Sequence, residues 1–157
     1  MELDRLDRQL LNLVQADAGQ TAEQMAEQVP LSPSAIQRRL RRLREAGVIA
    51  RDVALVDPKL IGRGDTFIAS LHIERERPEP MAQLRTWLAA EPQVQQAFYV
   101  TGEADFVLVV TALDTTHYEV LMSRLMQDNP CVKRYTTQVA LSVVKRGLAI
   151  PVSDCET

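Results

Sequence analysis

Residues 31–49 read LSPSAIQRRLRRLREAGVI, and this stretch decides how the chain is interpreted, because it combines five arginines with the signals of one short helix. Ser32 can accept a hydrogen bond from an N–H of the first turn, and Pro33 suits the first helical position because its missing N–H is not needed there. Gly47 tolerates the left-handed conformation that ends many helices. The segment therefore predicts a basic helix that begins after Ser32 and stops near Gly47.

The predicted helix has one apolar face and one polar face. Three residues at spacings of four and three form a stripe that must face a core, namely Ile36, Leu40 and Leu43. The polar face suits the DNA major groove, because a guanidinium group binds phosphate or the edge of guanine through two hydrogen bonds. We expect DNA contacts from Ser32, Ser34, Gln37, Arg38, Arg41 and Arg42. Arg39 lies nearer the core edge and is expected to extend its charged end from there to solvent. The alternative without a function is that the arginines only form a solvated helix face.

Two shorter helices are expected before the basic one. Thr21 and Gln24 form a T-x-x-Q capping box, which predicts a helix over residues 21–29. Residues 4–16 carry leucine and valine on one side and predict the first helix. Three short helices of which the last is basic indicate a helix-turn-helix. Residues 48–56 are apolar and β-branched, so we expect a short strand there that would form a wing.

Composition and charge fit a DNA-binding protein of one ordinary domain or two small ones. The 157 residues are 46% hydrophobic, and no stretch approaches the roughly 20 apolar residues that span a bilayer. The N-terminus lacks an apolar signal-peptide core, so we expect a cytoplasmic protein with no membrane partner. The net charge is −3, but positive charge is concentrated in residues 38–51, and the local field governs attraction to phosphate. Cys131 and Cys155 have no metal-ligand spacing and are expected to be unpaired thiols.

The second half of the chain predicts a different architecture. We expect a helix-turn-helix domain over residues 1–56, a linker over 57–64, a second domain over 65–151 and a tail over 152–157. The predicted strands and helices of the second domain occupy residues 67–73, 78–90, 94–100, 106–110, 115–127 and 132–144. This βαββαβ order indicates a ferredoxin-like sandwich, so the whole chain is of the α+β class. One face of its sheet would remain apolar, for instance through Val139 and Leu141, and is expected to pair with a second copy.

The combined motifs resemble the Lrp/AsnC, or feast/famine, family of transcriptional regulators. The resemblance rests on the LSPxxxxRRLxRLxxxGVI segment, Val56-Asp57-Pro58, the βαββαβ order and a G-x-x-D turn from Gly102 to Asp105. It implies a C-terminal amino-acid-responsive domain that dimerises through its sheets, with dimers often assembling into octamers. The effector would bind between dimers near this turn, at Thr101, Gly102, Glu103, Asp105, Tyr135 and Thr137. Taken without the resemblance, the turn is a plain hairpin in which Asp105 acts only as a cap.

The function expected from these observations is that of a sequence-specific, double-stranded-DNA-binding transcriptional regulator controlled by a small effector, most simply an amino acid. An architectural DNA-binding protein without effector is the main alternative, and it predicts sequence-tolerant, salt-dependent binding. Sirohaem-decarboxylase-like enzymes resemble the same family, but they are expected to keep histidines in the C-terminal cavity and to lose the basic helix. His72 and His117 lack a third ligand or a nucleophile, so we expect no enzyme activity, catalytic residue, metal or cofactor.

Overall fold

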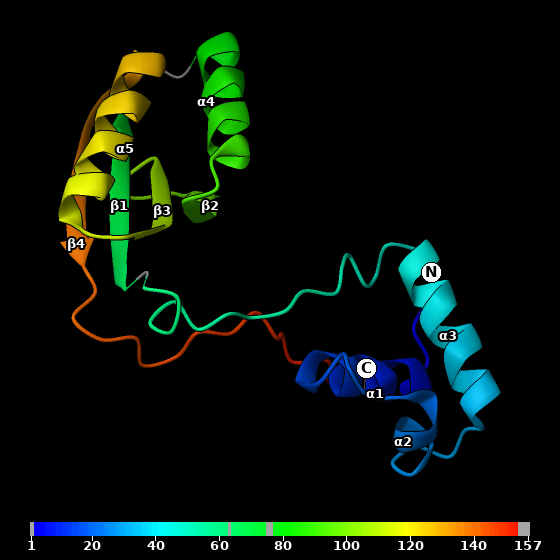
Figure 1. Ribbon diagram of the computed structural model, residues 1–157. Coiled ribbons are helices and arrows are strands. Elements are labelled where there is room, and N and C mark those ends of the chain that lie inside the picture. The colour runs from blue at the N-terminus through cyan, green and yellow to red at the C-terminus, as the bar shows by residue number, and fades with distance from the viewer. Residues whose placement is uncertain (1, 63, 75–76, 154–157) are drawn as a thin grey trace. The chain divides into compact units, whose positions relative to one another are not determined.

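The computed structural model describes residues 2–62, 64–74 and 77–153, and these form two compact units (Figure 1). The first unit combines the N-terminal residues up to Leu55 with the C-terminal segment from Lys145. The second unit spans Val56–Val144. Within the described ranges, no helix is long and apolar enough to cross a membrane.

Three helices build the first unit, and each begins at a side chain that caps it. They are α1 (Arg5–Ala16), α2 (Ala22–Ala26) and α3 (Pro33–Glu45). Asp4 and Thr21 each take part in a reciprocal capping box, and Ser32 accepts a hydrogen bond from the backbone N–H of Ala35. Such caps satisfy N–H groups that have no partner inside the helix. The structure confirms the predicted caps at Thr21 and Ser32, although α2 is shorter than expected.

The apolar stripes of the three helices meet in one core. The buried residues of this core are Leu10, Leu11, Val14, Met25, Val29, Ile36, Leu40 and Leu43. Gly47 ends α3 as predicted, because its φ of 72° is left-handed and the N–H of Val48 turns back to the carbonyl of Leu43 at 2.9 Å. The strand expected over residues 48–56 is wrong, since these described residues form no strand in this structure. A strand needs a backbone partner, and apolar, β-branched sequence does not supply one.

The C-terminal segment belongs to the helical unit, which differs from the domain boundaries expected from the sequence. Side chains on one face of α1 donate hydrogen bonds to its backbone carbonyls, from Arg8 to Ser153, from Asn12 to Val152 and from Gln15 to Ile150. The side chain of Val152 packs against the helical core. In this structure residues 145–153 therefore group with the helical unit, and the expected tail residues 154–157 lie outside the described ranges.

The second unit is a four-stranded antiparallel sheet with two helices. Its elements are β1 (Asp65–Ile73), α4 (Pro78–Ala90), β2 (Val94–Tyr99), β3 (Phe106–Ala112), α5 (Thr115–Asp128) and β4 (Val132–Val139). The strand order is β2-β3-β1-β4, which confirms the predicted ferredoxin-like sandwich. Alternate residues of β1 and β3 are buried against both helices, and Phe67, Leu71 and Leu108 lie in this core. Among the described residues of this unit, no helix lies on the opposite face of the sheet (Figure 1).

The face opposite the helices is apolar, but its residues are not those expected. Ile68, Val107 and Val109 lie there half-buried, and the side chain of Phe98 is 51% exposed. Val139 instead pairs with Phe67 and therefore lies on the helix-covered side. Strand β4 ends at Val139, although the N–H of Ala140 still donates a hydrogen bond to the carbonyl of Thr66 in β1 at 2.8 Å. Leu141 follows the strand and is 99% exposed, so it does not lie on the helix-free face.

Candidate nucleic-acid interface and effector site

The exposed side of α3 presents all the side chains that the sequence assigned to DNA. Ser32, Ser34, Gln37, Arg38, Arg41 and Arg42 are exposed. The hydroxyl oxygen of Ser32 lies 3.2 Å from that of Ser34 and also caps the helix. The first turn of α3 contains no acidic residue, so its positive dipole and free N–H groups remain favourable for a phosphate. The geometry therefore offers a basic surface that starts at a helix N-terminus.

The five arginines of α3 fall into two groups. Arg39 and Arg42 bind carboxylates of the α1 region, and Arg44 pairs with Asp52 at 3.2 Å. For Arg38 and Arg41 the described residues provide no acidic partner. The guanidinium groups of Arg38 and Arg41 are therefore available to an external anion, whereas Arg42 already has a partner within its own unit.

Asp7 is the functional residue that sequence reasoning missed. Its side chain is only 1% exposed, and it accepts hydrogen bonds from Arg39 at 2.8 Å and from Arg42 at 2.5 Å. A buried carboxylate needs such partners, because removing its charge from water is costly. The signal in the sequence is the spacing of Asp7 with Leu10 and Val14, which places a carboxylate on the buried stripe of α1.

Asp4 extends this cluster toward solvent. The backbone N–H of Asp7 and then the guanidinium of Arg39 hold the pKa of Asp4 below its usual range. Hydrogen bonds to the carboxylate of Asp4 and then to that of Asp7 raise the pKa of Arg39. Both groups therefore stay charged, and the N-terminus of α1 is bound to the middle of α3 by ion pairs as well as by the apolar core.

The predicted effector turn joins β2 to β3. Gly102 has a φ of 120°, a conformation that disfavours other residues, and the N–H of Val100 closes the hairpin on the carbonyl of Asp105 at 2.9 Å. The carboxylate of Asp105 accepts the N–H of Ile73 at 2.7 Å, and its own N–H donates to the carbonyl of Leu71. Asp105 therefore acts as a backbone cap within this chain, which is the plain alternative considered for it.

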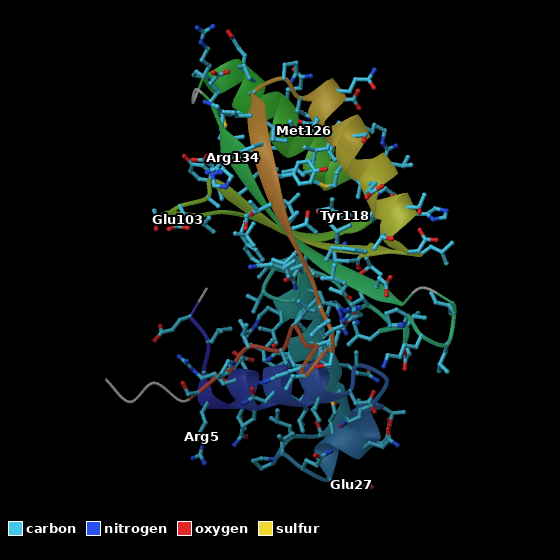
Figure 2. All side chains as sticks on the ribbon, turned by 90° about the vertical axis from the view of Figure 1, so that its left-hand side faces the viewer. Arg5, Glu27, Glu103, Tyr118, Met126 and Arg134 are labelled. Carbon is cyan, nitrogen blue, oxygen red and sulfur yellow. The ribbon has the colours of Figure 1, made fainter. Side chains whose placement is uncertain are left out.

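The other expected effector residues lie at two levels of the sheet. Tyr135 pairs with Leu71, so it lies at the same end of the sheet as the turn. Figure 2 shows Glu103 of the turn and Arg134 of β4 on the side away from α5. Thr137 lies two residues further along β4, about 7 Å at strand spacing, and its hydroxyl is 2.7 Å from that of Tyr118. Tyr135 packs against the helix-covered core on β4, which β1 separates from β3 and the turn, and Thr137 is hydrogen-bonded to α5.

Tyr118 links this hydroxyl pair to the core. Its ring stacks on that of Phe67 with 4.1 Å between centroids, and burial raises the pKa of its phenol. The hydroxyl of Thr137 therefore meets a neutral phenol, which can donate or accept. This pair fixes β4 against α5 on the helix-covered side of the sheet.

A separate open groove lies at the start of α4. It is lined by Glu74, Arg77, Pro80, Gln83, Pro130 and Cys131, and none of the expected effector residues takes part. Burial raises the pKa of the Cys131 thiol, which is free and points to the carbonyl of Pro80. A protonated, half-buried thiol of this kind is a packing group. The expectation for Cys155 lies outside the described residues.

Comparison with known proteins agrees with both units. A winged helix-turn-helix DNA-binding model matches residues 3–50, and the Lrp/AsnC ligand binding domain matches residues 66–150. An uncharacterized HTH-type transcriptional regulator of Sinorhizobium fredii is 43% identical over 97% of this chain and 90% of its own length. An AsnC family transcriptional regulator from Agrobacterium tumefaciens has a similar structure, with a TM-score of 0.89 at 26% identity over 96% of this chain and 97% of its own.

A feast or famine regulatory protein from M. tuberculosis, solved in complex with L-methionine, is also similar. Its TM-score is 0.80 at 26% identity, and the match covers 92% of this chain and 96% of that one. A helix-turn-helix with a basic third helix, joined to a ligand-binding sandwich, defines a DNA-binding transcriptional regulator. The chain belongs to the Lrp/AsnC family of such regulators.

The contact between Asp105 and Ile73 generates a stability prediction. Asp105→Ala leaves the N–H of Ile73 without its acceptor and should lower the free energy of unfolding of the second unit by about 1–3 kcal/mol. Asp105→Asn keeps an acceptor oxygen and should lose less. Urea unfolding followed by the fluorescence of Trp87, the single tryptophan of the chain, measures both variants. Equal stability of the alanine variant and the wild type would contradict the capping role.

Proposed function

We propose that the exposed side of α3 reads operator DNA and that an amino acid bound at the β2–β3 turn controls this binding. The DNA-reading residues are Ser32, Ser34, Gln37, Arg38 and Arg41. The observation that carries the proposal is the exposure of Arg38 and Arg41 without acidic partners in the described chain, on a helix whose other side is buried. Their guanidinium groups are placed to bind phosphates or guanine edges in a major groove.

The effector part of the proposal rests on the ligand-binding family match and on the chemistry around the turn. The related M. tuberculosis protein was solved with L-methionine, which supports an amino acid here. A free amino acid needs N–H or hydroxyl donors for its carboxylate and an acceptor for its ammonium group. The proposed site is Thr101, Gly102, Glu103, Asp105, Tyr135 and Thr137.

The contacts of these residues distinguish those suited to bind the effector from those that hold the site in place. Backbone N–H groups of the turn and the hydroxyl of Thr101 are suited to the effector carboxylate, and Glu103 is exposed and suited to the ammonium group. Asp105 contributes by holding the turn on Ile73, and Thr137 by holding β4 on α5. The turn lies at the surface of the single chain, so a second copy would complete the pocket.

Self-association belongs to the same proposal. The helix-free face of the sheet exposes Phe98 beside half-buried Val107 and Val109, a surface that a second sheet would cover. We propose a cytoplasmic homodimer. Octamers are the higher assembly that the resemblance to the Lrp/AsnC family implies. A two-fold dimer would place its two α3 helices on successive turns of the same DNA.

The DNA-reading face is tested with Arg38→Gln and Arg41→Gln. Each variant should weaken binding to duplex DNA and make the slope of log affinity against log salt less negative by about 0.9 per lost phosphate contact. Fluorescence anisotropy across a salt series measures the slope. Lys133→Gln, an exposed charge change on β4, is the matched control and should retain the wild-type slope. Wild-type slopes in both arginine variants would place the DNA interface elsewhere.

The effector is tested by thermal melting of the protein with each of the twenty amino acids. A ligand present at 100 times its Kd stabilises the folded form by about 2.7 kcal/mol if it binds only that form. We expect one chemical class of amino acid to raise the Tm selectively. Glu103→Gln should reduce this shift while leaving the Tm of the free protein unchanged, since Glu103 is exposed. No shift with any amino acid would contradict an amino-acid effector.

A further inference from the structure

The ion-pair cluster between α1 and α3 has a consequence for DNA recognition that concerns Arg42. The side chain of Arg42 is 49% exposed and lies on the solvent side of α3, where sequence alone assigns it to DNA. Its Nη2 nevertheless donates to Oδ2 of Asp7 at 2.5 Å, and Asp7 is almost completely buried. The side chain of Arg42 is thus half exposed to solvent and is at the same time ion-paired with a buried carboxylate.

The carboxylate of Asp7 is held in place by other contacts and would not move if Arg42 turned away from it. Its Oδ1 is held by Arg39 at 2.8 Å, and its Oδ2 also accepts the backbone N–H of Asp4 at 3.3 Å as part of the α1 capping box. If the guanidinium of Arg42 bound a phosphate instead, the buried carboxylate of Asp7 would lose one of its two cationic partners. Removing one member of a buried ion pair is costly, because the remaining charge is not solvated. A phosphate at the surface recovers little of that cost, because water and salt screen it.

We propose that Asp7 is a positioning residue that withholds Arg42 from the DNA backbone and limits the number of phosphates that α3 neutralises. Arg38 and Arg41 then carry the phosphate and base contacts, while Arg42 fixes α3 on α1. Fewer non-specific phosphate contacts mean that a larger share of the affinity depends on base contacts. Asp7 would therefore increase discrimination between operator and other DNA. This inference rests on the proposed DNA-reading face of α3.

The test is the salt dependence of binding to mixed-sequence duplex DNA by the full chain carrying Asp7→Asn. Asparagine keeps the size and one acceptor oxygen but loses the charge that holds Arg42. We expect a slope of log affinity against log salt that is more negative by about 0.9 for each DNA-bound subunit, together with tighter binding at low salt. Arg42→Gln added to Asp7→Asn should return the slope to the wild-type value.

Asp4→Asn is the matched control, because it removes one negative charge from the same cluster. Asp4 contacts Arg39 and not Arg42, so its variant should keep the wild-type slope. If Asp4→Asn steepens the slope as much as Asp7→Asn, a general change of field explains both and the proposal is overturned. A folded Asp7→Asn variant with an unchanged slope overturns it as well. Far-ultraviolet circular dichroism reports whether the helices of each variant are intact.

If Asp7→Asn does not fold, Arg42→Gln alone decides the matter. The proposal expects the wild-type slope, because Arg42 makes no phosphate contact to lose. A slope less negative by about 0.9 shows that Arg42 binds DNA and overturns the proposal while the α3 face stands. Wild-type slopes for Arg38→Gln, Arg41→Gln and Arg42→Gln together overturn both the face and this inference.

Discussion

The charge of Asp7 is the constraint on which the DNA-binding unit depends. A carboxylate that is 1% exposed must be neutralised where it lies, and Arg39 and Arg42 of α3 are the groups that do so. The buried stripe of α3 turns Arg38 and Arg41 toward solvent, because Ile36, Leu40 and Leu43 on the other side face the core. The ion pairs add directional contacts that join α1 and α3 at defined atoms.

The chain connects the ligand-binding unit to this helical unit at both of its ends. Val56–Val144 forms the sandwich, while Leu55 and Lys145 on either side belong to the helical unit. Three side chains of α1 hold the returning segment by its carbonyls, at Ser153, Val152 and Ile150. An effector can act on DNA binding only if it favours one arrangement of the protein over another. Two connections, rather than one, are available to transmit that preference.

Sequence reasoning succeeded where the signal was local. The caps of α2 and α3, the end of α3 at Gly47 and the βαββαβ order depend on residues within one element, and all were predictable. The ion pairs of Asp7 were not, because its partners Arg39 and Arg42 lie 32 and 35 residues away in the sequence. The strands expected over residues 48–56 and 140–144 are not formed among the described residues, because apolar, β-branched sequence does not by itself determine which residues pair with a neighbouring strand. From the sequence, Asp105 could bind an effector or cap the turn. Its capping contact became evident only from the position of the backbone N–H of Ile73.

The most direct test of the central claim is selection of bound sequences from a pool of random duplex DNA, with and without a mixture of amino acids. A regulator whose α3 helices read bases as a two-fold pair predicts enrichment of a symmetric motif. Its half-sites should be separated by about one turn of DNA, roughly 34 Å, and amino acids should change the yield. Recovery of a pool that stays random, equally with and without amino acids, would contradict the account and indicate an architectural protein that binds DNA without reading it.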